Sequence, residues 1–83
     1  MKPGDLVEYT GYHNLVLTQR PGRWSVDNPI VTRMKGGQLG LVIATTDIQI
    51  GGRSFSFTRA EALVLYECRL GWGVIGTSLR VHA

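Results

Sequence analysis

The final part of the chain limits the choice of fold more than any other segment. Residues 62–67 form an apolar run, and residues 70–75 form a second one across a short polar turn. Thr77 and Ser78 then suit a single helical turn before a closing segment over residues 79–82. Short apolar runs separated by turn residues predict antiparallel strands that pair with their neighbours along the chain. This succession of elements is typical of the end of a small β-barrel.

Turn signals divide the preceding part of the chain into further short strands. We expect strands over residues 5–10, 15–18 and 38–46, where apolar and β-branched residues alternate or cluster. The register decides which face of such strands is buried. The expected core, on one choice of faces, is Leu6, Val7, Leu41, Ile43, Leu63, Leu65, Val74, Ile75, Leu79 and Val81.

Glycines mark two special positions among these strands. Residues 47–50 and 53–57 flank Gly51-Gly52, which predicts a β-hairpin with a two-residue turn. Gly40 lies inside an apolar run and indicates a bulge or a close approach of two backbones. With no convincing amphipathic helix longer than two turns, we expect an all-β fold, a small barrel of five to seven strands.

One segment lacks the periodicity of a strand. Residues 19–37 contain Pro21-Gly22 and Asn28-Pro29, which disfavour regular structure, so they predict one long loop. Residues 15–18 either extend the first strand or pair back on it. Counted from the turn at Gly11, the long basic loop with this short strand spans about 11–37. Loops of this length in compact domains are usually functional or disordered. Four of its side chains are basic: Arg20, Arg23, Arg33 and Lys35.

Length and composition set further bounds. The 83 residues, 43% of them hydrophobic, predict a single folded domain over 1–83. The single Cys68 has no partner for a disulfide within the chain, and no apolar run reaches the length of a membrane span. The first residues run directly into turn and strand signals, so we expect no secretory leader, no membrane association and folding in a reducing cytoplasm.

Catalytic and cofactor motifs are not found in the sequence. Residues 71–76 match the glycine spacing of a dinucleotide fingerprint, but a chain that ends at residue 83 leaves no room for the required βαβ unit. His13, His82 and Cys68 are too far apart in sequence to suggest a metal site. Cys68, beside Arg69, fits a turn or strand-end cysteine packed as a small apolar side chain better than a nucleophile. We therefore expect no enzyme, no cofactor and no metal.

The two tryptophans and the basic loop are the candidate binding residues. Trp72 suits either the core or the rim of a barrel, whereas Trp24 suits an anchor on another chain better than a side chain folded back on its own domain. Tryptophan and arginine are enriched at the centres of protein interfaces, but they also stack on bases and contact phosphates. A solvated loop with no binding role is the third reading. The candidates for partner binding are Arg20, Arg23, Trp24, Arg33, Lys35 and Trp72.

Several short motifs resemble a known family. Gly4-Asp5-Leu-Val, Gly40-Leu-Val-Ile, Ala62-Leu-Val-Leu-Tyr, Gly71-Trp and Leu79-Arg-Val are similar to small Src-homology-3-like barrels. More narrowly, they resemble short barrel proteins of tailed bacteriophages. This resemblance implies a non-enzymatic structural or assembly protein of the virion, assembled in the host cytoplasm. Its partners would be other protein subunits, in a homo-oligomer or a larger assembly.

The first two motifs also resemble the KOW-type modules of ribosomal and transcription proteins. That resemblance implies the alternative function, a small nucleic-acid-binding module. A net charge of +3 permits nucleic acid as a partner without selecting it. Against this alternative, residues 41–52 contain no Lys or Arg, where KOW-type modules generally carry a basic strand. The acidic loop with an aromatic pair, by which eukaryotic barrels of this type hold proline-rich peptides, is also missing.

Overall fold

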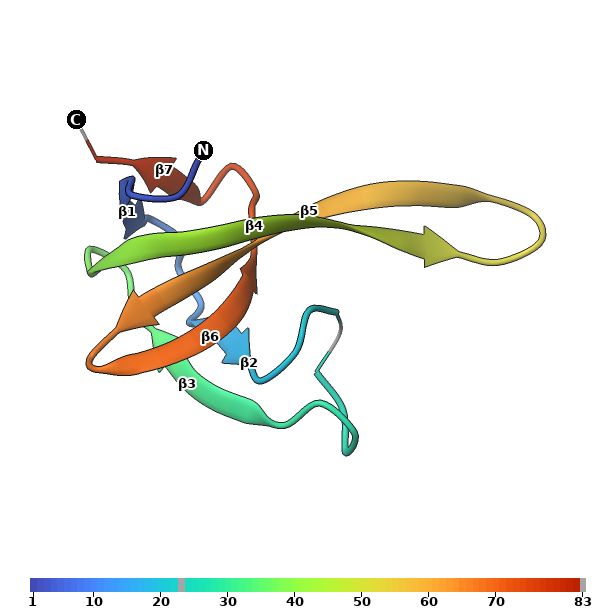
Figure 1. Ribbon diagram of the computed structural model, residues 1–83, viewed down its shortest axis with the longest axis horizontal. Coiled ribbons are helices and arrows are strands. Elements are labelled where there is room, and N and C mark those ends of the chain that lie inside the picture. The colour runs from blue at the N-terminus through green and yellow to red at the C-terminus, as the bar shows by residue number, and fades with distance from the viewer. Residues whose placement is uncertain (23, 83) are drawn as a thin grey trace.

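The computed structural model describes residues 1–22 and 24–82 and contains seven strands, all paired antiparallel (Figure 1). In the sheet they lie in the order β3-β2-β6-β5-β4-β1-β7. The all-β prediction, with five to seven strands, is confirmed. No helix among the described residues is long and apolar enough to cross a lipid bilayer. The strands are β1 (Leu6–Tyr9), β2 (Leu15–Thr18), β3 (Ile30–Met34), β4 (Leu39–Gly51), β5 (Ser56–Tyr66), β6 (Arg69–Val74) and β7 (Leu79–Val81).

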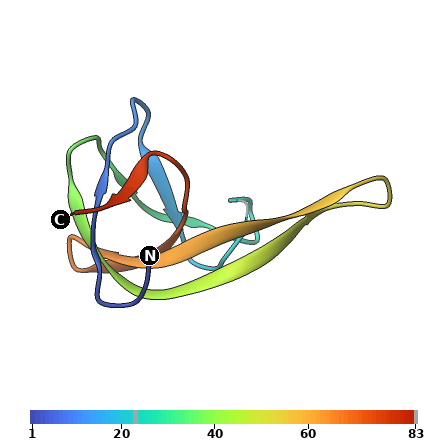
Figure 2. The same ribbon diagram turned by 90° about the horizontal axis from the view of Figure 1, so that it is seen from above.

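The sheet curls around one hydrophobic core, as the view from above shows (Figure 2). Its edge strands, β3 and β7, form no pairing with each other in the described residues, so the curled sheet is a half-barrel. The concave side, here called the inner face, carries the core. Its buried hydrophobic side chains are Val7, Tyr9, Leu17, Met34, Val42, Ala62, Val64, Tyr66 and Leu79.

Glycines allow the inner face to close tightly. A Cβ added to Gly71 would lie 2.5 Å from the Cβ of Leu17, and one added to Gly40 would lie 2.4 Å from Cγ1 of Val64. Both positions therefore require glycine, because atoms from other strands occupy the space that a side chain would take. Gly40 therefore marks a close approach, as predicted, but chiefly to a side chain, that of Val64, and not to a second backbone.

Much of the expected core lies on the opposite face. Only two of its members are buried, Val7 and Leu79, while Leu63 and Ile75 are partly buried. The choice of faces was wrong because β4 and β5 are apolar on both sides, so their pattern contains no inward-outward signal. On these two strands, Gly40, Val42, Ala62 and Val64 lie on the tight concave side, and the larger leucines lie on the convex side. The exposed members on the outer face are Leu6, Leu41, Ile43, Leu65 and Val74, whereas Val81 is exposed although it lies opposite the core residue Val7, because it is on the edge strand β7.

The expected loop over 11–37 is shorter than predicted. β2 and β3 form a hairpin within it, with Leu15 opposite Met34 and Val16 opposite Arg33. The β-branched run at the start of β3 and its pairing with β2 override the turn signals around it. Among the described residues, 19–22 and 24–29 remain outside the strands and make the irregular link between β2 and β3, here called the connection 19–29.

The predicted turns are real, but their lengths differ. The hairpin between β4 and β5 turns over residues 52–55, where Gly52 N–H donates to the Phe55 carbonyl at 2.8 Å, instead of over Gly51-Gly52. Glu67 and Cys68, both at positive φ, form the two-residue turn between β5 and β6. The Leu79 N–H donates to the Gly76 carbonyl, so residues 76–79 form a single tight turn and no helix.

Two features of the β4–β5 pair shape the molecule. The pairing register shifts between Val42 and Ala44, which marks a β-bulge at Ile43. Beyond it the two strands leave the sheet as a projecting ribbon, residues 47–59, here called the arm (Figure 1). The arm gives the molecule its long axis, 39 Å against 26 and 24 Å for the other two.

Candidate functional site

The convex side of the sheet, here called the outer face, carries a row of four leucines. Leu6 lies opposite Leu41, Leu41 opposite Leu65, and Leu65 opposite Leu70, so the row crosses β1, β4, β5 and β6. These side chains are 36–49% exposed. Cross-strand neighbours on one face lie close enough to pack against one another. The leucine row is therefore a continuous apolar surface that faces solvent.

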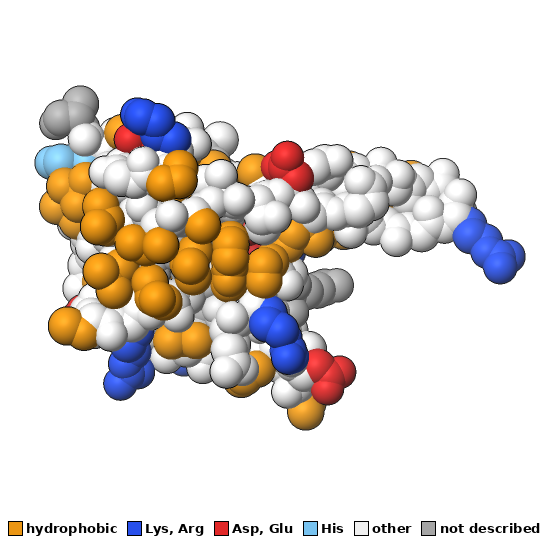
Figure 3. All heavy atoms as spheres, in the orientation of Figure 1, with side chains coloured by type: hydrophobic (Ala, Val, Ile, Leu, Met, Phe, Trp, Pro, Cys, Tyr) orange, Lys and Arg blue, Asp and Glu red, His pale blue; other side chains and the backbone are white. Residues whose placement is uncertain are grey.

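The apolar surface extends beyond the leucine row. Figure 3 shows hydrophobic side chains gathered over the body of β4, β5 and β6, with basic side chains lying apart at the periphery. Large exposed apolar patches on soluble proteins usually mark interaction sites. The other apolar residues of this face, fixed by strand alternation and register, are Leu39, Ile43, Leu63, Trp72 and Val74.

A cavity of about 150 Å³ opens at the base of the arm, where the outer face meets the connection 19–29. A buried ion pair forms part of its wall. Glu61 is 1% exposed, and its Oε2 accepts hydrogen bonds from Nε and Nη2 of Arg59, the second at 2.9 Å. The Gly22 N–H donates to Oε1 of the same carboxylate. Both carboxylate oxygens are thus satisfied, as a buried charge requires.

Two tryptophans and several apolar side chains form the rest of the cavity. Trp72 reaches it from β6, and Trp24 reaches it from the connection 19–29. Trp24 is 61% exposed, so most of its ring faces solvent at the cavity mouth. The remaining lining residues are Leu15, Val16, Thr18, Gly22 and Val74.

Hydrogen bonds fold the connection 19–29 on itself and join it at Gly22 to the outer face. The buried Asn28 side chain accepts from the Arg20 N–H and donates to the Arg20 carbonyl, each at 2.8 Å. Ser25 and Asn28 exchange two backbone hydrogen bonds, both at 3.1 Å. Together with the bond from Gly22 to Glu61, these contacts fix the segment that carries Trp24.

The structure brings only two of the predicted site residues to one place. Trp24 and Trp72 line the same cavity, whereas Arg20, Arg33 and Lys35 are exposed and are not among its lining residues. Arg23 lies outside the described residues. Whether these side chains bind a partner stays a prediction.

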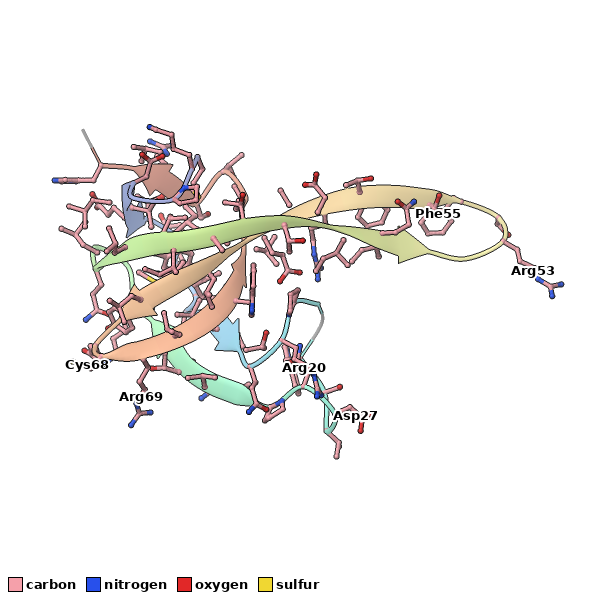
Figure 4. All side chains as sticks on the ribbon, viewed as in Figure 1. Arg20, Asp27, Arg53, Phe55, Cys68 and Arg69 are labelled. Atoms are coloured by element: carbon pink, nitrogen blue, oxygen red, sulfur yellow. The ribbon has the colours of Figure 1, made fainter. Side chains whose placement is uncertain are left out.

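Cys68 lies on an exposed turn at the end of the β5–β6 hairpin, beside Arg69 (Figure 4). The turn position was anticipated, but packing as a small apolar side chain was wrong. The described residues contain no group of three or more His, Cys, Asp or Glu that could hold a metal ion.

Sequence reasoning missed Arg59, Glu61 and the leucine row. The spacing Arg59-x-Glu61 was a usable signal, because residues two apart on a strand share a face and an i, i+2 pair of opposite charge can meet there. The apolar residues on both faces of β4 and β5 were a second signal, since a strand in a half-barrel buries only one of them.

The chain matches no protein-family model, no curated protein sequence and no solved structure.

Proposed function

We propose that this chain is a non-enzymatic assembly protein, an Src-homology-3-like barrel that forms part of a tailed-phage virion and binds other protein subunits. The observation that carries the proposal is the leucine row on the outer face of the sheet. Four leucines aligned across four strands form a surface whose burial against another apolar surface is favourable in free energy. The resemblance of the short motifs to phage barrel proteins supports a location of the chain in the virion.

The chemistry of the outer face favours a protein partner over nucleic acid. The leucine row carries no charge, while nucleic-acid binding depends on Lys and Arg against phosphates. The basic side chains are spread over the molecule: Arg53 lies at the end of the arm and Arg69 at the far end of the body (Figure 4). A face of aligned leucines instead fits the apolar core of a protein–protein interface.

The first test is the composition of the particles made by the virus that encodes the chain. We expect quantitative mass spectrometry of purified particles to find the chain at a fixed copy number. Its absence from the particles would overturn the proposal. A gel-shift titration with DNA and RNA at two salt concentrations tests the alternative. Tight binding with a log–log salt slope of about −0.7 to −0.9 per phosphate contact would favour the nucleic-acid module instead.

A pair of variants tests whether the leucine row is the contact surface. Leu41→Gln with Leu65→Gln replaces two central members by polar side chains, and we expect incorporation into particles to fall more than tenfold. Leu41→Val with Leu65→Val is the matched control, because it keeps an apolar β-forming surface and should retain most of the incorporation. Equal incorporation of both double variants would show that another surface makes the contact.

A further inference from the structure

The arm has one apolar and one polar side. The pairing register places Ile50 opposite Phe57 and Ile48 opposite Arg59 on one face, and Gln49 opposite Thr58 on the other. At its end, the rings of Phe55 and Phe57 stack with centroids 6.3 Å apart, although the two residues are 66% and 48% exposed. A two-stranded hairpin on its own is marginally stable in water. An amphipathic arm with exposed stacked aromatic rings therefore has the character of an element that a partner covers.

The apolar side of the arm continues into the cavity at its base. Phe57, Arg59 and Glu61 alternate along β5 and so lie on the same face of the strand. Arg59 and Glu61 line the cavity together with Trp24 and Trp72. Phe55 lies roughly 20 Å from Glu61 along the hairpin, at about 3.3 Å per residue. One surface therefore carries protruding aromatic rings at one end and an aromatic-walled cavity at the other.

The cavity has the size of an aromatic ring. Its volume is about 150 Å³, and most of its wall is apolar. An apolar cavity of about 150 Å³ in another protein binds benzene. The arm cannot fill the cavity of its own chain, because it extends away from the body (Figures 1 and 2). A second copy of the chain can supply the ring.

We propose that two copies of this chain clasp each other through their arms. In this dimer the arms lie antiparallel along their apolar sides about a twofold axis, and one ring of each Phe55–Phe57 pair enters the cavity of the other copy beside Trp24 and Trp72. A surface with a protrusion at one end and a matching cavity at the other is self-complementary under a twofold rotation. This inference rests on the proposed function, because it names a second copy as one of the subunits that the chain binds.

Two side chains of opposite charge lie near the two ends of this surface. Arg53 lies at the tip of the arm, two residues from Phe55, and Asp27 lies on the connection that carries Trp24 (Figure 4). Both residues are exposed. When the tip of one arm meets the other copy's cavity, Arg53 comes to the same end of the interface as Asp27. Opposite charges placed in this way favour the correct register and disfavour alternatives.

Sedimentation equilibrium of the full chain is the first measurement, and we expect a mass twice the monomer mass of 9.1 kDa. Phe55→Ala with Phe57→Ala removes the rings, and Trp24→Ala opens the cavity. Each variant should weaken the dimer at least roughly 30-fold, as loss of a buried aromatic anchor does. Gln49→Ala with Ser56→Ala, on the polar side of the arm, is the matched control and should leave the dimer intact. A wild-type chain that stays monomeric at 200 µM would overturn the clasp.

Mixing the two weakened variants gives the sharper result. The chain with Trp24→Ala keeps its aromatic tip, and the chain with Phe55→Ala and Phe57→Ala keeps its cavity, so the mixture can form one intact contact. We expect the mixed dimer to be more stable than either variant's own dimer. Arg53→Asp should weaken the dimer, and adding Asp27→Arg should restore it. No gain on mixing, with the wild type dimeric, would show that another surface joins the copies.

The same measurements separate this inference from the proposed function. Leu41→Gln with Leu65→Gln leaves the arm and the cavity unchanged, so this variant should still dimerise while its incorporation into particles falls. If the clasp fails, the chain can still be found in particles through the leucine row. If the proposed function fails, the chain is missing from particles while the wild type still sediments as a dimer.

Discussion

Val42 and Val64 are sealed inside the half-barrel, while Leu41 and Leu65, their neighbours on the same two strands, are more than a third exposed. Both pairs lie directly opposite each other in the sheet. At these positions the smaller side chains lie on the tight concave side and the larger ones on the convex side, while larger side chains from other strands, such as Leu17 and Met34, complete the core. An apolar side chain in this fold stabilises the monomer on the inner face and is available to a partner on the outer face.

The largest expected effect is on the free energy of unfolding when the same substitution, leucine to alanine, is made on each face. Leu17→Ala on the fully buried inner face should lower the free energy of unfolding by about 2–5 kcal/mol, because it leaves a cavity in the core. Leu65→Ala on the outer face should cost less than about 1 kcal/mol, because its side chain is already 38% exposed. Urea titration of both variants measures the difference. Equal costs would mean that the outer face also acts as core.

The second prediction concerns Glu61, which is buried although it lies on the outer face. Arg59→Met keeps most of the side-chain length but removes the cation beside Glu61, which is 1% exposed. Breaking a buried ion pair costs about 3–5 kcal/mol, and we expect about 2–4 kcal/mol because the Arg59 side chain is itself 24% exposed.

The double variant Arg59→Met with Glu61→Met provides the control for this pair, because it removes both charges. Its stability should recover most of the loss, since no unpaired charge remains. A double variant as unstable as the single one would show that packing, and not charge, sets the cost.

The third prediction tests how tightly the inner face is closed. Gly71→Ala places a methyl group 2.5 Å from the Leu17 Cβ, so the strands must move apart, at a cost of about 1–3 kcal/mol in unfolding free energy. Gly76→Ala is the matched control, because no atom lies within 4 Å of its added Cβ. Thermal unfolding of both variants compares them. A Gly71→Ala protein as stable as the control would show that the inner face has room to adjust.

The smallest effect belongs to the turn before β1. The Lys2 side chain and backbone N–H donate to the Asp5 carboxylate, which lowers the Asp5 pKa below 3.8. A lowered carboxyl pKa stabilises the folded state above the ordinary value, and this contribution is lost as the pH falls through the folded-state pKa. Unfolding midpoints of the wild type should therefore approach those of Asp5→Asn as the pH falls below about 4. A constant gap between them from pH 6 to pH 3 would contradict this.

Most of the strands could be predicted from the sequence, but which face of each strand is buried could not. Turn residues and apolar runs indicated the strands at both ends of the chain, because local signals dominate there. β3 was hidden, since Asn28-Pro29 and Gly36-Gly37 surround it and its pairing with β2 is a tertiary effect. The faces of β4 and β5 depend on the curl of the whole sheet, which no local alternation reports.

The candidate site was predictable only in part, for the same reason. Trp24 and Trp72 stood out by residue type, and the structure brings them to one cavity. Their meeting depends on how the connection 19–29 folds over the outer face, which Asn28 and Glu61 determine through hydrogen bonds. The spacing Arg59-x-Glu61 indicated that these two side chains could meet, but not that Glu61 would be buried or that the hairpin beyond Arg59 would leave the sheet.

The bulge at Ile43 has an evolutionary consequence. Before it, odd-numbered residues of β4 point to the outer face. After it, even-numbered residues do, which keeps Ile48 and Ile50 on the side of Phe57. Deleting this one residue would leave every pair on either side in place and change only the local bend and twist, which bulges increase. A single-codon deletion at this point would change the direction of the arm without exchanging its apolar and polar sides.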